Sequence, residues 1–66
     1  MTTGQTIKMI RLKLGLTMKE FGKKFDPPAS DSIVSRWERD VSVPNPKRIK
    51  RIMELGDVDV LDLLLK

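Results

Sequence analysis

Two adjacent prolines, Pro27 and Pro28, are the strongest constraint on how this chain can fold. Neither proline can continue an α-helix, and each pushes the residue before it toward extended geometry. Two further signals interrupt the chain on either side. Gly15 can end a helix in the left-handed conformation, and Asn45-Pro46 has the form of an N-cap followed by proline at the first helical position. A chain of 66 residues divided in this way has room for short elements only.

The segments between these breaks predict helices, because apolar residues recur at helical spacing while the alternation expected of strands is poor. The first helix is expected to bury one face, made of Ile7, Ile10, Arg11 and Leu14. The second is expected over residues 17–25. Thr17 is its predicted N-cap, and Glu20 stands at the reciprocal position of a capping box.

Three more helices are predicted beyond the prolines. One covers about residues 31–39, with Ser30 as its N-cap and Val34 and Trp37 on its inward face. The next follows Asn45 and ends at Gly56, and a short leucine-rich helix begins at Asp59. The fold class expected for residues 1–66 is therefore all-α: five helices around one core in a single domain.

Composition excludes several classes of function. The chain has no cysteine and no histidine, so we expect no disulfide, no metal site, no cofactor and no catalytic residues, and the protein is not expected to be an enzyme. No apolar run is long enough to span a membrane, and residues 1–6 lack the features of a signal peptide, which predicts a cytoplasmic protein. Residues 1–53 carry twelve basic and five acidic side chains. That excess suits a polyanion, although a solvated surface is the alternative.

Four segments carry a family resemblance: residues 14–22 (LGLTMKEFG), residues 33–39 (IVSRWER), Val43-Pro44 and residues 55–64 (LGDVDVLDLL). Together they resemble the lambda-repressor/Cro-type (XRE-like) helix-turn-helix transcriptional regulators, and the resemblance extends over about residues 4–65. It implies a five-helix DNA-binding domain of a bacterial or phage repressor or Cro-like regulator. The sequence departs from the family pattern in two places. The turn at residues 26–30 is about two residues longer than usual, and Met18 stands where the family usually has glutamine.

In that family the helix over residues 31–39 lies in the major groove of DNA. The resemblance therefore implies base contacts from the residues opposite the buried face: Asp31, Ser32, Ser35 and Arg36. Arg36 is the best candidate, because a guanidinium group matches guanine O6 and N7 in a bidentate pair. The alternatives are that Arg36 contacts only phosphate or water, and that Asp31 serves only the helix start.

Phosphate contacts are expected at the starts of the second and fourth helices, where free amides and the helix dipole favour anions, and near the end of the DNA-contacting helix. The residues concerned are Thr17, Met18, Lys19, Arg39, Ser42, Asn45 and Lys47. Four other cations have no direction that the sequence defines, and a solvated face is their alternative: Lys23, Arg48, Lys50 and Arg51.

Arg11 lies on the apolar face of the first helix, where an unpaired charge would be costly. The family typically pairs such an arginine with the glutamate of the DNA-contacting helix, which implies a structural ion pair between Arg11 and Glu38. Trp37, three residues after Val34, is expected in the core.

The expected partner is a pseudo-palindromic double-stranded DNA operator bound by a homodimer, which could be a monomer when isolated. No membrane and no small-molecule substrate are expected. The surplus leucines Leu61, Leu64 and Leu65 are candidates for the dimer contact, or for a junction to a further domain of a longer repressor. The alternative function is a protein-interaction module that presents the same leucine-rich helix to another regulator.

Overall fold

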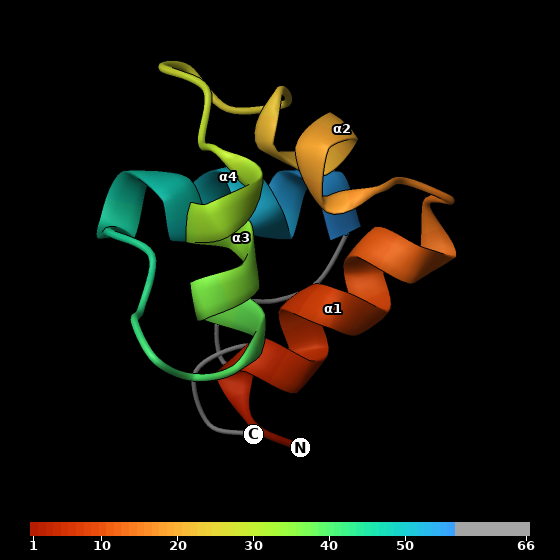
Figure 1. Cartoon of the computed structure of the whole chain (residues 1–66), viewed down its shortest axis with the longest axis vertical. Coiled ribbons are helices and arrows are strands. Elements are labelled where there is room, and N and C mark those ends of the chain that lie inside the picture. Colours follow the sequence, from red (N-terminus) through yellow and green to blue (C-terminus); the bar gives the residue numbers. More distant parts are fainter. Residues whose placement is uncertain (57–66) are drawn as a thin grey trace.

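The computed structural model of this protein describes residues 1–56, which form four helices. Helix α1 spans Thr3–Lys13, α2 spans Met18–Gly22, α3 spans Asp31–Glu38 and α4 spans Pro46–Gly56. Helix α3 packs against α1 and α2, and α4 packs against α1 (Figure 1). The described residues contain helices and no strand, which confirms the all-α class. The fifth predicted helix, with its start at Asp59, lies outside the described residues.

Each described helix begins at a side-chain cap. The caps are Thr2 for α1, Thr17 for α2, Ser30 for α3 and Asn45 for α4. The last three confirm the sequence prediction, because an N-cap depends on residues only three positions apart. The α1 cap was not predicted, although Thr2 and Gln5 form a complete capping box.

Helix α1 ends in a Schellman motif. The Gly15 N–H donates to the Leu12 carbonyl at 3.0 Å, and the Leu16 N–H donates to the Arg11 carbonyl at 3.1 Å. Gly15 has a φ of 71°, as its position in the sequence predicted. Leu14 was predicted on the buried face, but this was wrong: it is the C-cap and is 43% exposed. The helix ends there and the chain turns away toward α2, so the Leu14 side chain leaves the buried face.

Helix α2 ends at Gly22, whereas the sequence predicted an end at Phe25. The reason is tertiary. The Gly22 carbonyl accepts a hydrogen bond from the Ala29 N–H at 2.9 Å, so the long turn folds back onto the end of the helix. A side chain at Gly22 would collide with the Ala29 carbonyl oxygen. The extra length of the turn is thus used to place Phe25 and Ala29, which are both buried, against the core.

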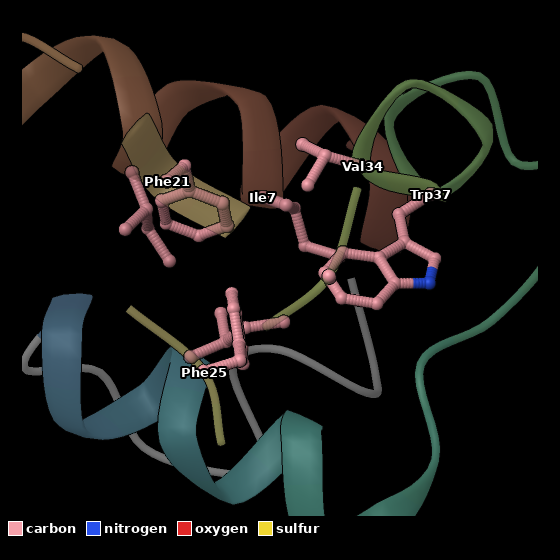
Figure 2. Close-up of a cluster of buried hydrophobic side chains, with 8 residues drawn as sticks. Ile7, Phe21, Phe25, Val34 and Trp37 are labelled. Atoms are coloured by element: carbon pink, nitrogen blue, oxygen red, sulfur yellow. The ribbon is translucent and has the colours of Figure 1, made fainter. Parts of the chain in front are cut away.

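The core joins all four described helices and the turn between α2 and α3. Three aromatic rings form a continuous row within it: Phe21 meets Phe25, and Phe25 meets Trp37, each pair at 5.4 Å between ring centroids and edge to face. Figure 2 shows these rings beside Ile7 and Val34. Such ring pairs stabilise by about 0.5–1.5 kcal/mol beyond their area burial. Trp37 is therefore a core residue, as predicted, and it anchors α3 from within.

Candidate nucleic-acid interface

Helix α3 has one buried and one open face. Val34, Trp37 and Glu38 are buried, whereas Arg36 and Arg39 are exposed. Ser30 begins the helix by accepting a hydrogen bond from the Ile33 N–H at 3.2 Å, and this fixes the rotation of the first turn. With one side held in the core, the polar side of α3 is directed outward over its whole length.

A shallow groove runs between α2 and α3, and we call it the α2–α3 groove. Helix α2 and its cap contribute one wall and α3 contributes the other; the lining residues are Thr17, Met18, Lys19, Asp31, Ser32, Ser35, Arg36 and Arg39. All four predicted base-contact residues are in this set, together with four of the seven predicted phosphate contacts. The groove combines two guanidinium groups, one ammonium group and three hydroxyls with a single carboxylate.

One contact inside the groove restrains a guanidinium group. Arg39 Nε donates to Ser35 Oγ at 3.2 Å, one helical turn back along α3. Ser35 is half-buried, so its hydroxyl gives Arg39 a fixed partner at the base of the groove. The bond leaves the Ser35 hydroxyl proton free to donate. Arg36, the favoured base-contact residue, is exposed on the same wall.

The start of α2 forms the opposite wall and carries a capping box. Thr17 Oγ1 accepts from the Glu20 N–H at 3.1 Å, and Glu20 Oε1 accepts from the Thr17 N–H at 2.9 Å. This second bond lowers the Glu20 pKa from its ordinary value of 4.5. Because the Thr17 amide is already used, the groove receives from Thr17 a hydroxyl proton rather than a free N–H.

Three predicted phosphate contacts lie outside the α2–α3 groove. Ser42 and Asn45 belong to the segment between α3 and α4, and the Asn45 side chain caps α4 by accepting from the Arg48 N–H at 2.9 Å. Lys47 lines a different groove, formed by α4 and the turn between α2 and α3. The structure therefore does not gather the predicted phosphate contacts at one place.

Arg11 and Glu38 lie together in the interior, and both residues are buried. Arg11 Nε donates to Glu38 Oε2 at 2.6 Å, and Arg11 Nη2 donates to Glu38 Oε1 at 3.1 Å. The remaining nitrogen, Nη1, donates to the Leu16 carbonyl at 2.9 Å. This bidentate pair links α1 to α3, and its third bond reaches the loop before α2. Arg11 thereby connects α3 to the loop that leads into α2.

A second link, not predicted from the sequence, joins α1 to the end of α3. Asp40 has a φ of 58°, a left-handed conformation uncommon for a residue with a side chain. Its carboxylate accepts from the Gly4 N–H at 2.9 Å and from the Thr2 hydroxyl at 2.6 Å. The Asp40 N–H donates to the Trp37 carbonyl and the Val41 N–H to the Arg36 carbonyl, so Asp40 closes a Schellman motif. Only the Thr2–Gln5 capping-box pattern gave any sequence signal for this arrangement.

Two kinds of feature are absent from the described residues: a cluster of potential metal ligands and a membrane-spanning helix. Within residues 1–56, no group of three or more side chains with metal-ligand chemistry comes together. In the same part of the chain, no helix has the length and apolar content needed to cross a bilayer.

Comparison with known proteins identifies the fold. A family model described as helix-turn-helix matches residues 7–63, which covers all of α2 and α3 and most of the chain. The family is one of DNA-binding regulators. No match was found among the curated proteins or among the solved structures.

Proposed function

This chain belongs to the lambda-repressor/Cro-type helix-turn-helix family of DNA-binding regulators, and from that premise we propose that it binds a specific double-stranded DNA sequence with α3 in the major groove. The observation that carries the proposal is the α2–α3 groove. It combines the start of α2 with the outer face of α3, and its hydroxyl and guanidinium groups can form hydrogen bonds with base edges. As the family resemblance implies, the protein would act as a bacterial or phage transcriptional regulator, either a repressor or a Cro-like protein.

Arg36 is proposed as the principal base contact, with guanine as its partner. Ser32 and Ser35 are short enough to permit close approach of α3 to the DNA. The hydrogen bond from Arg39 to Ser35 supports a DNA contact by Arg39 as well, because a guanidinium group that is already held in one place loses less entropy on binding. Asp31 lies in the first turn of α3. Its carboxylate either interacts favourably with the helix dipole or accepts a hydrogen bond from a cytosine amino group.

Phosphate contacts are proposed at the α2 wall, from the Thr17 hydroxyl, the Met18 amide and the Lys19 side chain. Arg39 and Ser42 would follow the same DNA backbone beyond the end of α3. Asn45 and Lys47 are proposed for a separate contact at the start of α4. These contacts would set the position of α3 without reporting the sequence.

A homodimer on a pseudo-palindromic operator is proposed from the family resemblance, with the half-sites about one helical turn apart. The candidate dimer residues Leu61, Leu64 and Leu65 lie outside the described residues. Sedimentation of the free protein and of the DNA complex would count the protomers in each. One protomer per complex on an operator with two half-sites would contradict the dimer.

The proposed function is tested by selecting preferred duplexes from a random library and measuring affinity by fluorescence anisotropy. Arg36→Ala is compared with Lys13→Ala, which removes the same charge from an exposed position on α1. Loss of a bidentate guanine contact is expected to reduce discrimination by about 1–3 kcal/mol at one base pair. Equal weakening on every duplex would show that Arg36 contacts only phosphate. Failure of folded protein to bind any duplex at low salt would refute DNA binding.

A further inference from the structure

A second groove lies between α4 and the turn that joins α2 to α3, and we call it the turn–α4 groove. Six cationic and two acidic side chains line it, a net charge of +4, and the whole chain also carries +4. Both walls contribute exposed lysines: Lys23 and Lys24 from the turn, Lys47 and Lys50 from α4. No hydroxyl or amide side chain lines it, and four of its six cations are lysines, which bind phosphate as point charges.

The two arginines of this groove have a different task from the lysines. Arg51 Nε donates to the Lys24 carbonyl at 2.8 Å, and Arg48 Nη2 donates to the Pro27 carbonyl at 3.3 Å. The Arg48 guanidinium also lies 5.6 Å from the centre of the Trp37 ring. These contacts attach the turn to α4 and to the core. They therefore fix the two walls that carry the lysines relative to each other.

The concentration of like charge is unfavourable unless an anion occupies the groove. Lys47 and Arg51 are four residues apart on α4, a spacing at which like charges repel and weaken a helix. The two carboxylates offset only part of this: neither Asp26 nor Glu54 forms a salt bridge with any of the described residues, and the groove keeps a net charge of +4. A bound polyanion would supply the missing compensation.

The cationic path is continuous with the α2–α3 groove. Lys19 lines that groove and also a hollow beside the start of α3, and Lys23 lines both this hollow and the turn–α4 groove. A chain of phosphates can therefore follow cations from α3 around α2 to α4. We propose that the turn–α4 groove is a second contact for the DNA backbone, which takes the phosphates flanking the sequence bound in the α2–α3 groove. This inference rests on the proposed function, and it extends the DNA footprint around the long turn.

The test compares two pairs of substitutions that change net charge equally. Lys23→Gln with Lys50→Gln, the groove pair, removes one exposed lysine from each wall of the groove, and neither residue is among the contacts proposed above. Lys8→Gln with Lys13→Gln, the α1 pair, removes two exposed lysines from α1 and serves as the control. The affinity of each protein is measured by fluorescence anisotropy across a salt series, on a preferred duplex with long flanks and on one trimmed to the preferred sequence. Thermal unfolding followed by circular dichroism checks that both pairs remain folded.

On the long duplex, the groove pair is expected to make the negative slope of log affinity against log salt shallower by about 1.8, which is two phosphate contacts at about 0.9 each. The preference between selected and scrambled duplexes should stay the same, and the trimmed duplex should show little change. The α1 pair should leave the slope as it is. The proposal would be overturned if the two substituted proteins had equal salt slopes. It would also be overturned if the protein with the groove pair bound the long duplex with the affinity and salt slope of the unsubstituted protein.

A labelled peptide rich in aspartate and glutamate is measured in parallel. If the groove pair abolishes binding of that peptide and leaves the DNA slope unchanged, the groove serves an acidic protein segment and the proposal is wrong. If the unsubstituted protein binds no duplex at all, the proposed function itself fails. Binding with sequence preference but without a contribution from Lys23 and Lys50 refutes the second contact alone.

Discussion

The two grooves of this domain differ in what lines them and in what holds them. The α2–α3 groove has three cations, one carboxylate and three hydroxyls, whereas the turn–α4 groove has six cations, two carboxylates and no hydroxyl. Hydrogen-bonding groups of several kinds suit discrimination between bases, and ammonium groups suit attraction to any phosphate. The two proposals together would place sequence discrimination and general attraction on separate surfaces of one small domain.

Their supports differ as well. The α2–α3 groove depends on the buried pair Arg11–Glu38, which fixes α3 from inside the molecule. The turn–α4 groove depends on hydrogen bonds from Arg48 and Arg51 to backbone carbonyls at the surface. A defect in the first support should therefore cost far more stability than a defect in the second.

The largest effect is expected from Arg11→Met, which leaves the Glu38 carboxylate buried without its partner. Breaking a buried pair from one side typically costs about 3–5 kcal/mol, enough to unfold much of a domain this small. Urea unfolding followed by circular dichroism measures the loss, and DNA affinity should fall with it. The double variant Arg11→Met, Glu38→Leu should recover most of the stability, because no buried charge then remains. An unchanged urea midpoint in the single variant would contradict the role of the pair.

A smaller effect is expected at Asp40, which follows the C-terminal end of α3. Asp40→Ala removes the acceptor of the Gly4 N–H and keeps a side chain in the left-handed conformation, and together these should cost about 1–3 kcal/mol. Asp40→Gly loses the same acceptor but relieves the backbone, so its free energy of unfolding should lie between alanine and aspartate. Gly15→Ala isolates the backbone cost alone, since nothing lies within 4 Å of that position. Equal stability of the alanine and glycine variants at position 40 would contradict this division.

Arg51→Met tests the surface support of the turn–α4 groove. Loss of the hydrogen bond to the Lys24 carbonyl is expected to cost about 0.5–1.5 kcal/mol in the free energy of unfolding. Amide hydrogen exchange in residues 23–30 should accelerate, while exchange in α3 stays slow. Lys50→Met is the matched control, because it removes the same charge from a neighbouring exposed position on α4. If both variants behave alike, the turn is not held by Arg51.

The smallest effect is expected from Glu20→Gln, which removes a negative charge near the α2–α3 groove. The Glu20 pKa is lowered in the folded protein, so its stabilisation is present above about pH 4.5 and is lost as pH falls through the folded pKa. The unsubstituted protein should therefore lose stability relative to the variant as the solution is acidified. Urea unfolding at pH 7 and pH 3 measures this difference, with Glu54→Gln as control. A difference that is the same at both pH values would count against the capping role of the carboxylate.

Local features of the fold could be predicted from the sequence, and long-range ones could not. The caps Thr17, Ser30 and Asn45 were predictable because each acts on an amide three residues away. The end of α2 was not, because it depends on Ala29 returning to the Gly22 carbonyl. The tie between Thr2 and Asp40 joins residues 38 positions apart, and no local pattern reveals it.

The site shows the same division. Helical spacing placed Ser32, Ser35 and Arg36 opposite the buried face of α3, and these residues do line one groove. The partner of Arg11 came from the family resemblance, since periodicity alone identified only a cation on an apolar face. The course of the long turn decides where Lys23 and Lys24 lie. Two prolines limit that course without determining it, so the second groove could not be predicted.

The buried pair of Arg11 and Glu38 also bears on heredity. A single substitution at either position leaves the other charge unpaired in the interior. Selection would remove most such variants before a compensating substitution could arise at the partner position. Substitutions at the two sites are therefore expected to be inherited together, as both charges or neither, among proteins that share this ancestry. The exposed residues of α3 are not coupled in this way. The proposed DNA sequence preference can therefore diverge while the buried ion pair that holds α3 stays the same.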